Sequence, residues 1–276
     1  MPNVPMHSFT FNGLNSREYC SLFVSNGATH SAPERDIESV SIPGRNGELT
    51  IDHGRFKNIK LSYSGWIIED VDENVVKARN WLSFASGYKK LIDCYHNDLL
   101  GNPIEYRMAR LTGGVEFQLT NTYPVAAVTS LNFDCMPQRF LINGDNPIEI
   151  TESGTQIASP TFYQAVPLIK VDGTGSGKIS VKAFNEDSSV RFECEVKISD
   201  IGGTTYLDSD IERAYQIQNG IIVPVDNRIT LSNGYPRMNF DTISENDDPV
   251  ITERRTFIYF YDGVTKVTIT PRWWRI

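Results

Sequence analysis

A glycine-rich segment, Asp172-Gly173-Thr174-Gly175-Ser176-Gly177-Lys178, is the part of the sequence closest to a phosphate-binding loop. Such a loop requires a glycine five residues before its Gly-Lys pair and a serine or threonine directly after that pair. Asp172 occupies the first position and Ile179 the second. Residues 179–183 alternate like a strand, so no helix N-terminus is available to hold a phosphate. We therefore predict a β-hairpin turn at 172–177.

The histidines and cysteines lack the spacing of a metal site. The sequence contains no HExxH and no CxxC motif. Cysteines scattered through a chain of this size are usually buried free thiols. We predict no metal, no cofactor and free thiols at all four cysteines. The residues concerned are His7, His30, His53, His96, Cys20, Cys94, Cys135 and Cys194.

No constellation for nucleophilic or acid–base catalysis is recognisable. A GxSxG motif is absent, which weakens a serine hydrolase hypothesis. Among 34 acidic residues some pair always resembles that of a glycosidase, and only their separation in space can test it. We assign no catalytic, cofactor-binding or metal-binding residue and predict that the chain is not an enzyme. An enzyme acting on cell wall is kept as an alternative.

The chain ends in Pro271-Arg272-Trp273-Trp274-Arg275-Ile276, which is unusual for a terminus. Chain ends normally fray and avoid large apolar side chains. Two buried indoles would contribute about 2–3 kcal/mol each, so we expect this end to be tied into a sheet. Arg272 and Arg275 would stack on aromatic rings or pair with carboxylates. A sugar-stacking platform is the functional alternative.

Composition indicates a folded, acidic protein of two domains. The chain has 276 residues, 40% of them hydrophobic, and a net charge of -8. This balance argues against a broad nucleic-acid-binding face, which needs Lys and Arg on phosphates. No apolar run approaches the 18 or so residues of a membrane span, and the N-terminus has no signal-peptide pattern. We predict no membrane contact, no sequence-specific nucleic-acid binding and assembly in a cytoplasm.

Alternation of apolar and polar residues predicts strands through most of the first half. Residues 59–67 alternate most strictly. An earlier apolar run, with Ile37, Val40 and Ile42, ends at Pro43-Gly44-Arg45-Asn46-Gly47, which is typical of a tight turn or exposed loop. Residues 48–52 resume an extended pattern.

One segment has the spacing of a helix, which we predict at about 72–86. Asp70 or Asp72 would accept hydrogen bonds from the amides of the first turn, and Gly87 would end the helix in a left-handed conformation. Trp81 and Phe84 lie off the main apolar stripe, so the helix meets either more core or another subunit. The stripe consists of Val71, Val75, Ala78, Leu82 and Ala85.

Strands are again predicted at 91–95, 104–111, 115–120 and 125–135. Thr112-Gly113-Gly114 has hairpin-turn chemistry, so we predict an extended hairpin around it. Such a hairpin either folds back on its own sheet or reaches a neighbour, because unpaired edges invite pairing.

A polar stretch at 141–160, rich in Asn, Gly, Pro, Ser and Thr, predicts the boundary between domains 1–140 and 141–276. Many short strands separated by turns follow it, which indicates a β-sandwich or barrel and a mainly β protein overall. Predicted strands are 168–171, 179–183, 190–198, 221–225, 228–231, 256–261 and 264–270. Predicted turns or loops are 172–177, 185–187, 241–249 and 261–263.

Several motifs, in this order, resemble siphophage distal tail proteins. The resemblance spans nearly the whole chain, and the order of the motifs is more specific than any one of them. The motifs are Phe9-Thr10-Phe11-Asn12-Gly13 with Asn15-Ser16, Ala32-Pro33-Glu34-Arg35-Asp36, Ile42-Pro43-Gly44-Arg45-Asn46-Gly47-Glu48-Leu49, Tyr206-Leu207-Asp208-Ser209-Asp210, Asn233-Gly234-Tyr235-Pro236 and the terminal Pro271–Ile276.

The resemblance implies that residues 1–140 form a belt domain closing a homohexameric ring around a channel, and that residues 141–276 form a galectin-like β-sandwich. It implies a structural hub in the virion that joins the major tail tube protein to the tail-tip or tail-associated lysin protein and anchors receptor-binding proteins. An acidic lining of the channel would repel passing DNA. In a head-to-tail ring each subunit presents two different complementary patches.

The alternative function is a carbohydrate-binding module for host cell-wall sugar. Galectin-type sites combine a Trp platform with His, Asn, Arg and Glu on one sheet face. The second half of this chain contains no histidine, because the last one is His96. This departure argues against a galectin-type sugar site.

Overall fold

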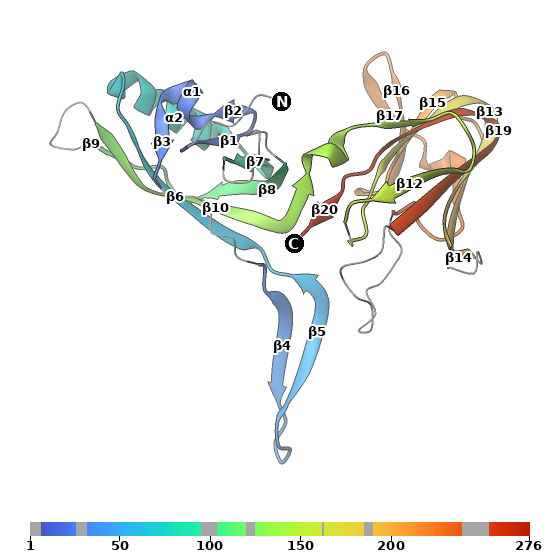
Figure 1. Ribbon diagram of the computed structural model, residues 1–276, viewed down its shortest axis with the longest axis horizontal. Helices are drawn as coiled ribbons and strands as arrows, with labels where there is room; N and C mark the ends of the chain where they lie inside the picture. The colour runs from blue at the N-terminus through green and yellow to red at the C-terminus, as the bar shows by residue number, and fades with distance from the viewer. Residues whose placement is uncertain are drawn as a thin grey trace. The chain divides into compact units, whose positions relative to one another are not determined.

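The computed structural model describes residues 7–25, 32–94, 104–119, 125–161, 163–184, 190–238 and 254–276. The chain divides into two compact units, residues 1–142 together with 276, and residues 143–275 (Figure 1). Antiparallel strands make up most of both units, which confirms the mainly β class. The loops predicted at 185–187 and 241–249 lie outside the described residues, as do His30 and His96.

The larger sheet of the first unit is antiparallel, and its central strands run in the order β2-β1-β7-β8-β10-β6-β3. Strand β9 pairs with β10 beside this order. The strict alternation predicted for residues 59–67 is confirmed, because the odd-numbered residues are all buried and the even-numbered ones are more exposed. The strands are β1 (Phe9–Phe11), β2 (Leu14–Asn15), β3 (Leu22–Val24), β6 (Ile59–Ile67), β7 (Lys89–Asp93), β8 (Glu105–Thr112), β9 (Phe117–Leu119) and β10 (Ala126–Leu141).

The predicted helix is present as α2 (Val71–Phe84), and its stripe packs into the core. The predicted caps are wrong. Asp70 is the N-cap residue, but it adopts a left-handed conformation with φ 42° and its side chain caps no amide. The helix ends at Ala85 in an extended conformation, and the left-handed Gly87 follows two residues later. A second helix, α1 (Ser16–Cys20), was not predicted, and the Asn15 side chain accepts hydrogen bonds from its first amides.

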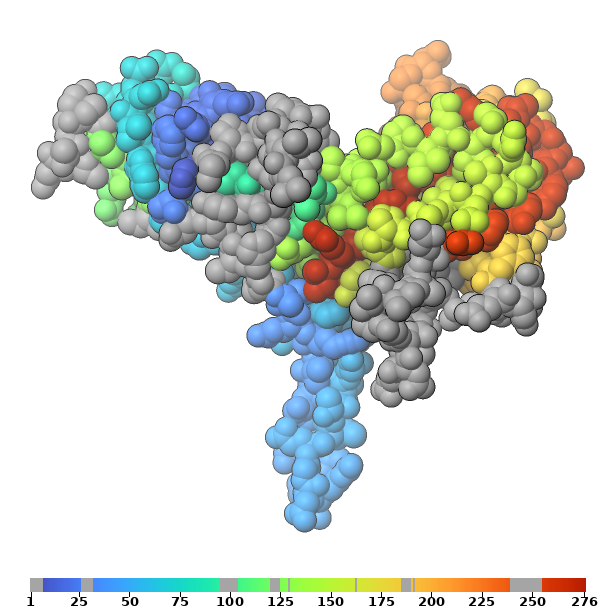
Figure 2. All heavy atoms as spheres, viewed as in Figure 1, coloured from blue at the N-terminus to red at the C-terminus, as the bar shows by residue number. Residues whose placement is uncertain are grey.

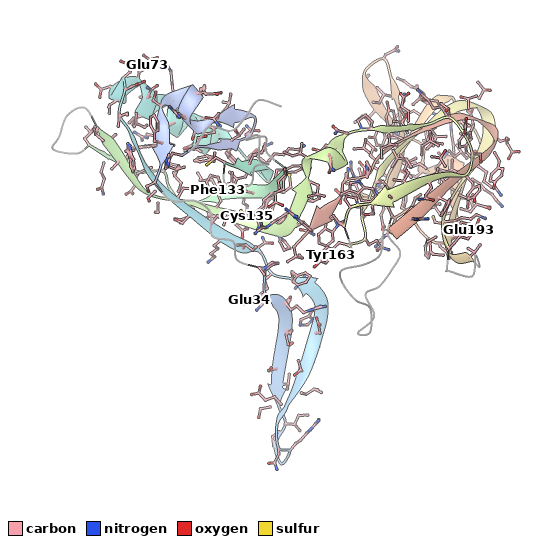
Figure 3. The ribbon with its side chains drawn as sticks, viewed as in Figure 1. Glu34, Glu73, Phe133, Cys135, Tyr163 and Glu193 are labelled. Atoms are coloured by element: carbon pink, nitrogen blue, oxygen red, sulfur yellow. The ribbon has the colours of Figure 1, made fainter. Side chains whose placement is uncertain are left out.

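Trp81 joins α2 to an aromatic core. Its indole Nε1 donates a hydrogen bond of 3.1 Å to the carbonyl of Phe11, and its ring stacks on Phe9 at 5.8 Å. Phe133, labelled in Figure 3 on β10, meets the rings of Phe9 and Phe11 edge-on. The two aromatic residues of α2 therefore differ in role, since Trp81 is core whereas Phe84 is 90% exposed.

The extended hairpin predicted around Gly113-Gly114 is wrong. Strands β8 and β9, on either side of these glycines, both pair with β10 rather than with each other. The reason is the length of β10, whose 16 residues offer separate stretches for the two strands. The extended hairpin of the first unit lies elsewhere, at residues 35–56.

The second unit also contains one antiparallel sheet, and its central order is β11-β19-β13-β15-β16-β17. Strand β12 pairs with β19, β14 with β13, and β18 with β14. The strands are β11 (Ile148–Ile150), β12 (Thr155–Ser159), β13 (Leu168–Phe184), β14 (Val190–Ile198), β15 (Gly203–Asp208), β16 (Arg213–Gln218), β17 (Ile221–Pro224), β18 (Ile229–Leu231) and β19 (Arg254–Thr270), with short 3-10 helices η1 (Ile142–Asp145) and η2 (Asp226–Arg228) and a terminal β20 (Trp274–Arg275).

The turns predicted at 172–177 and 261–263 are wrong, because β13 and β19 are each continuous through their glycines. The two strands pair along most of their length, with bulges at Asp172/Gly173 and Gly173/Gly177. A Cβ on Gly173 would collide with the Gly263 carbonyl, and one on Gly263 with the Thr174 carbonyl. The glycines therefore allow two backbones to approach closely, which is a recognised reason for glycine within a strand.

The C-terminal end is packed, as predicted. Trp273 is 4% exposed, and its backbone lies against Gly144, where an added Cβ would come within 2.5 Å of the Trp273 nitrogen. Trp274 stacks on Tyr163 at 4.4 Å and donates from Nε1 to the carbonyl of Gln164 at 3.0 Å. Large apolar side chains thus hold the last residues of the second unit in place.

Candidate assembly surface

The most exposed element of the first unit is a hairpin of β4 (Arg35–Ser41) and β5 (Glu48–Phe56). These strands pair with each other and form a separate two-stranded sheet. Figures 1 and 2 show the hairpin in blue, with its turn clear of the rest of the first unit. The Pro43–Gly47 motif forms this turn, as the sequence predicted, and Gly44 and Gly47 take positive φ of 81° and 85°.

One face of the hairpin is apolar. Val40 lies opposite Leu49, and Ile51 lies opposite Glu38 on the same face. Leu49 is 42% exposed and Ile51 40% exposed. The other face pairs Ser39 with Thr50, Ser41 with Glu48 and Ile37 with Asp52. The hairpin is therefore amphipathic, because Val40, Leu49 and Ile51 share one face whereas Ile37 lies among polar residues on the other.

Ion pairs hold the polar rim of the hairpin. Arg55 Nε bonds Asp36 Oδ2 at 2.7 Å, and Arg35 approaches Asp52 at 3.5 Å. The hydrogen bond from Arg55 lowers the pKa of Asp36. Exposed pairs of this kind contribute little to stability.

A two-stranded hairpin is marginally stable in water unless another surface covers its apolar face. The residues described in the first unit leave Leu49 and Ile51 uncovered. The face that carries Val40, Leu49 and Ile51 therefore lies uncovered by the described residues of the first unit, and we call it the hairpin face.

Further apolar side chains are exposed elsewhere on the first unit. They include the tip of α2 at Phe84 and the edge strand β9 at Leu119, which is 68% exposed. Isolated exposed apolar residues are common on monomers, so these positions do not by themselves mark an interface. Exposed apolar positions of the first unit outside the hairpin are Leu14, Tyr19, Trp66, Ile68, Val76, Phe84, Ile104 and Leu119.

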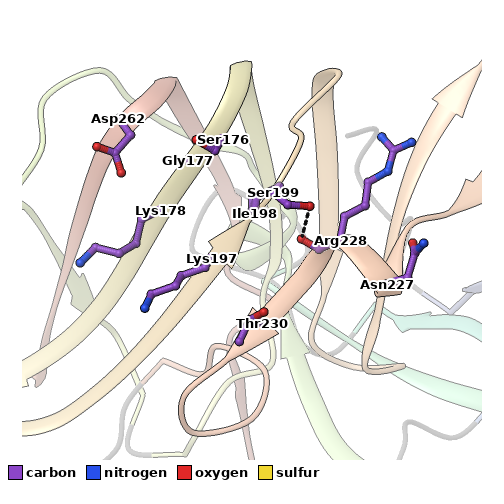
Figure 4. A pocket seen from close by; sticks show the side chains of 10 residues that line it. All are labelled: Ser176, Gly177, Lys178, Lys197, Ile198, Ser199, Asn227, Arg228, Thr230 and Asp262. Carbon is purple, nitrogen blue, oxygen red and sulfur yellow. Dashed lines mark hydrogen bonds between the residues drawn. The ribbon is translucent and has the colours of Figure 1, made fainter.

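The second unit contains a cleft of about 320 Å³, shown in Figure 4. Its cations are already paired, since Lys178 and Lys197 both contact Glu195 and Arg228 contacts Asp200 at 2.9 Å. The hydrogen bond from Lys178 lowers the pKa of Glu195. In Figure 4 the Lys178 and Lys197 side chains extend together to the left and the Arg228 side chain to the upper right, so the three do not converge on a common centre. The cleft shows no nucleophile–base pair among its lining residues.

The terminal tryptophans are occupied by packing contacts. Trp273 is buried, and the ring of Trp274 already stacks on Tyr163, which is labelled in Figure 3. Arg272 pairs with Asp208, which confirms the predicted arginine–carboxylate contact. A sugar platform made of both indoles is therefore contradicted by the packing of Trp273.

The cysteines and histidines are dispersed in the described part of the chain. All four cysteines are buried free thiols, as predicted, and burial raises the pKa of Cys135 to about 12. His53 lies on the hairpin, 3.7 Å from Glu38, and His7 is exposed. No group of three metal-binding side chains occurs among the described residues. Nor does any described helix have the length and apolarity needed to cross a bilayer.

Sequence reasoning located the hairpin turn but missed the importance of the strands beside it. Val40 and Leu49 were each visible as apolar positions flanking Pro43–Gly47. The signal that would have revealed the apolar face is that Val40 and Leu49, on the two sides of the turn, lie opposite each other and so share one face.

Comparisons with known proteins find similarity at the level of structure. No protein family and no curated protein matches the sequence. The SPP1 Dit protein, described as a paradigm of the hub adsorption apparatus in phages that infect Gram-positive bacteria, aligns with a TM-score of 0.62 and 12% identity, covering 95% of this chain and 97% of that one. Two structures of the phage p2 baseplate in its activated conformation, with Sr and with Ca, align at 0.44 and 0.41, with 9% and 8% identity over 94% of this chain and 90% of theirs. The chain therefore has the fold of a siphophage distal tail hub protein.

Proposed function

We propose that this chain is a non-enzymatic hub protein of a siphophage tail tip, and that six copies close into a head-to-tail ring. The observation that carries the proposal is the hairpin face, on a fold that aligns end to end with SPP1 Dit. A subunit with a detached amphipathic arm is suited to heterologous assembly, because the arm and its receiving surface are different patches.

In this proposal the first unit, predicted as 1–140, supplies the ring. The hairpin face packs on the next copy and so gains the cover that it lacks in one chain. Phe84 and Leu119 are candidates for the receiving surface, because both are strongly exposed and apolar. Their position outside the hairpin satisfies the requirement for two distinct patches.

The second unit, predicted as 141–276, is proposed to be a galectin-like sandwich that faces other tail proteins. The expected partners are the major tail tube protein, the tail-tip or tail-associated lysin protein and a receptor-binding protein, and the expected location is the virion. The terminal tryptophans support a structural role over sugar binding, because their rings are taken up by internal packing.

Two matched substitutions on the hairpin test ring formation. Ile51→Lys places an ammonium on the hairpin face opposite Glu38, whereas Ile37→Lys places one on the polar face opposite Asp52. Each lysine gains an acidic cross-strand partner, so both hairpins should keep their pairing. We expect light scattering to give six times the chain mass of 31.1 kDa for the unmodified protein and for Ile37→Lys, and smaller species for Ile51→Lys.

The unmodified protein provides the decisive control. A monomer at every concentration up to the millimolar range would overturn the ring. Equal assembly of Ile51→Lys and the unmodified protein would leave a ring but remove the hairpin face from its interface.

A further inference from the structure

Strand β17 is an open edge of the second unit. It pairs with β16 alone among the described strands and ends the central order of the sheet. Asn219 and Gly220 connect the two strands with φ of 52° and 79°. Positive φ at both positions is the mark of a type I′ turn, which gives a tight two-residue hairpin. The geometry of this edge is therefore fixed by its turn.

The register identifies the backbone groups that are left unpaired. Gln218 and Ile221 flank the turn, so Ile217 lies opposite Ile222 one step further along. Hydrogen-bonded and non-hydrogen-bonded pairs alternate in an antiparallel ladder, and the turn sets the first pair as hydrogen-bonded. The N–H and C=O of Ile222 therefore point away from β16, toward the open edge.

The side chains on this edge are apolar and uncharged. Ile217, Ile221 and Ile222 are 51%, 67% and 63% exposed. The run from Ile217 to Val225 contains no charged residue. Natural edge strands are usually protected by lysine or other charges, and here Pro224 is the single protective feature. An edge of this type is a template for another strand.

The size of the patch decides between possible occupants. Ile217 and Ile222 share one face and Ile221 lies on the other, so each face presents only on the order of 100–200 Å² of apolar surface. A stable interface needs roughly 800 Å² on each partner, so two copies of this edge pairing with each other would fall well short. A segment of a larger partner protein can bind here stably, because other contacts of that partner add to the interface.

We propose that β17 accepts an extended, apolar and uncharged segment of a partner protein as an additional strand. Backbone bonds to Ile222 give the pairing, and Ile217 with Ile222 on one face and Ile221 on the other accept apolar side chains. This site lies in the second unit and does not depend on ring formation.

Hydrogen exchange of the full chain tests the site, with a Thr-Ile-Thr-Ile-Thr peptide flanked by lysine pairs as the probe. We expect the Ile222 amide to exchange rapidly in the free protein and at least tenfold more slowly with saturating peptide. The same peptide methylated on alternate backbone nitrogens should give no protection. Ile222→Lys should abolish binding, whereas Ile211→Lys, an equally exposed isoleucine at the other end of β16, should retain it.

Three results would overturn the proposal. Protection of Ile222 in the dilute free protein would mean that the edge is already covered. Protection that grows with protein concentration and without peptide would identify a second copy as the occupant. Equal effects of the methylated and unmethylated peptides would show that no strand is added.

Discussion

The guanidinium of Arg272 holds the carboxylate of Asp208 with two hydrogen bonds, from Nη1 at 2.7 Å and from Nη2 at 3.1 Å. The two residues are 64 positions apart in the sequence, and Arg272 directly precedes the buried Trp273. Bidentate pairs of this kind combine charge with a fixed geometry. The pair therefore fastens the end of the chain to the β15–β16 turn of the second unit.

Replacing Asp208 with Asn should lower the free energy of unfolding by about 1–3 kcal/mol, because it leaves the half-buried Arg272 without its counter-charge. Burial raises the pKa of Asp208, but the hydrogen bonds and charge of Arg272 outweigh it and the net pKa lies below the usual 3.8. Stability from this group is thus present above pH 3.8 and is lost as pH falls through the lower folded value.

Urea denaturation of both proteins between pH 7 and pH 2.5 measures this contribution. The difference between the unmodified protein and Asp208→Asn should shrink below pH 3.8. Glu149→Gln, at an exposed pair with Lys266, is the control and should change stability by less than about 1 kcal/mol. A difference that stays constant down to pH 2.5 would contradict the assignment.

Substituting Trp81 with Phe should destabilise the first unit by about 1–3 kcal/mol. The change removes the indole N–H that bonds the Phe11 carbonyl and part of the buried ring that stacks on Phe9. Phe84→Ser on the same helix should alter stability by less than about 0.5 kcal/mol, since the ring is 90% exposed. Thermal unfolding of both variants provides the comparison, and equal losses would refute the distinction between the two rings.

An alanine at Gly263 should prevent the close approach of β13 and β19. Its Cβ would meet two backbone carbonyls, of Thr174 and Ser176, which cannot move aside as a side chain can. We expect a loss of at least about 1–3 kcal/mol or failure to fold. Gly114→Ala is the matched control, because a Cβ there meets nothing within 4 Å. Thermal denaturation followed by circular dichroism measures the stability of both variants. Similar stability for the two would contradict the close approach of β13 and β19 at Gly263.

The buried thiols should resist alkylation. Burial raises the pKa of Cys20 and of Cys194 to about 11 each, and that of Cys135 to about 12. The thiolate is the reactive form, so iodoacetamide at pH 8 should modify these three residues slowly in the folded protein and completely in guanidinium. Mass spectrometry of the peptides gives the rates. Fast modification of Cys135 without denaturant would show that the core around β10 opens readily.

Sequence periodicity was sufficient to predict a strand or helix where one face of the element is buried and the other is exposed. Residues 59–67 and the stripe from Val71 to Ala85 are of this kind, and both elements form where predicted. Glycine was a poorer guide to the positions of turns. It occurs in turns, but it also occurs inside strands where two backbones approach too closely for a Cβ. Gly173 and Gly263 serve a contact between strands about 90 residues apart, which no local pattern records.

The hairpin face illustrates the other limit. Its apolar residues could be seen in the sequence. Their exposure, however, depends on the fact that β4 and β5 form a separate sheet and do not join the larger one. Strands β8 and β9 beside Gly113-Gly114 pair with β10, whereas β4 and β5 pair with each other and form the detached arm at residues 35–56. Which strands pair with each other depends on the whole unit, so it cannot be read from any short stretch of sequence.

Continuous pairing of β13 with β19 also sets the order in which the second unit can form during synthesis. Leu168 pairs with Thr270 and Lys182 with Phe257, so the centre of this unit cannot form until residues 257–270 have been translated. Strand β13 therefore leaves the ribosome before its partner β19, and its apolar side chains stay uncovered until the two strands pair. A chain that lacks residues 257–276 should therefore stay bound to chaperones, because β13 has lost its partner strand.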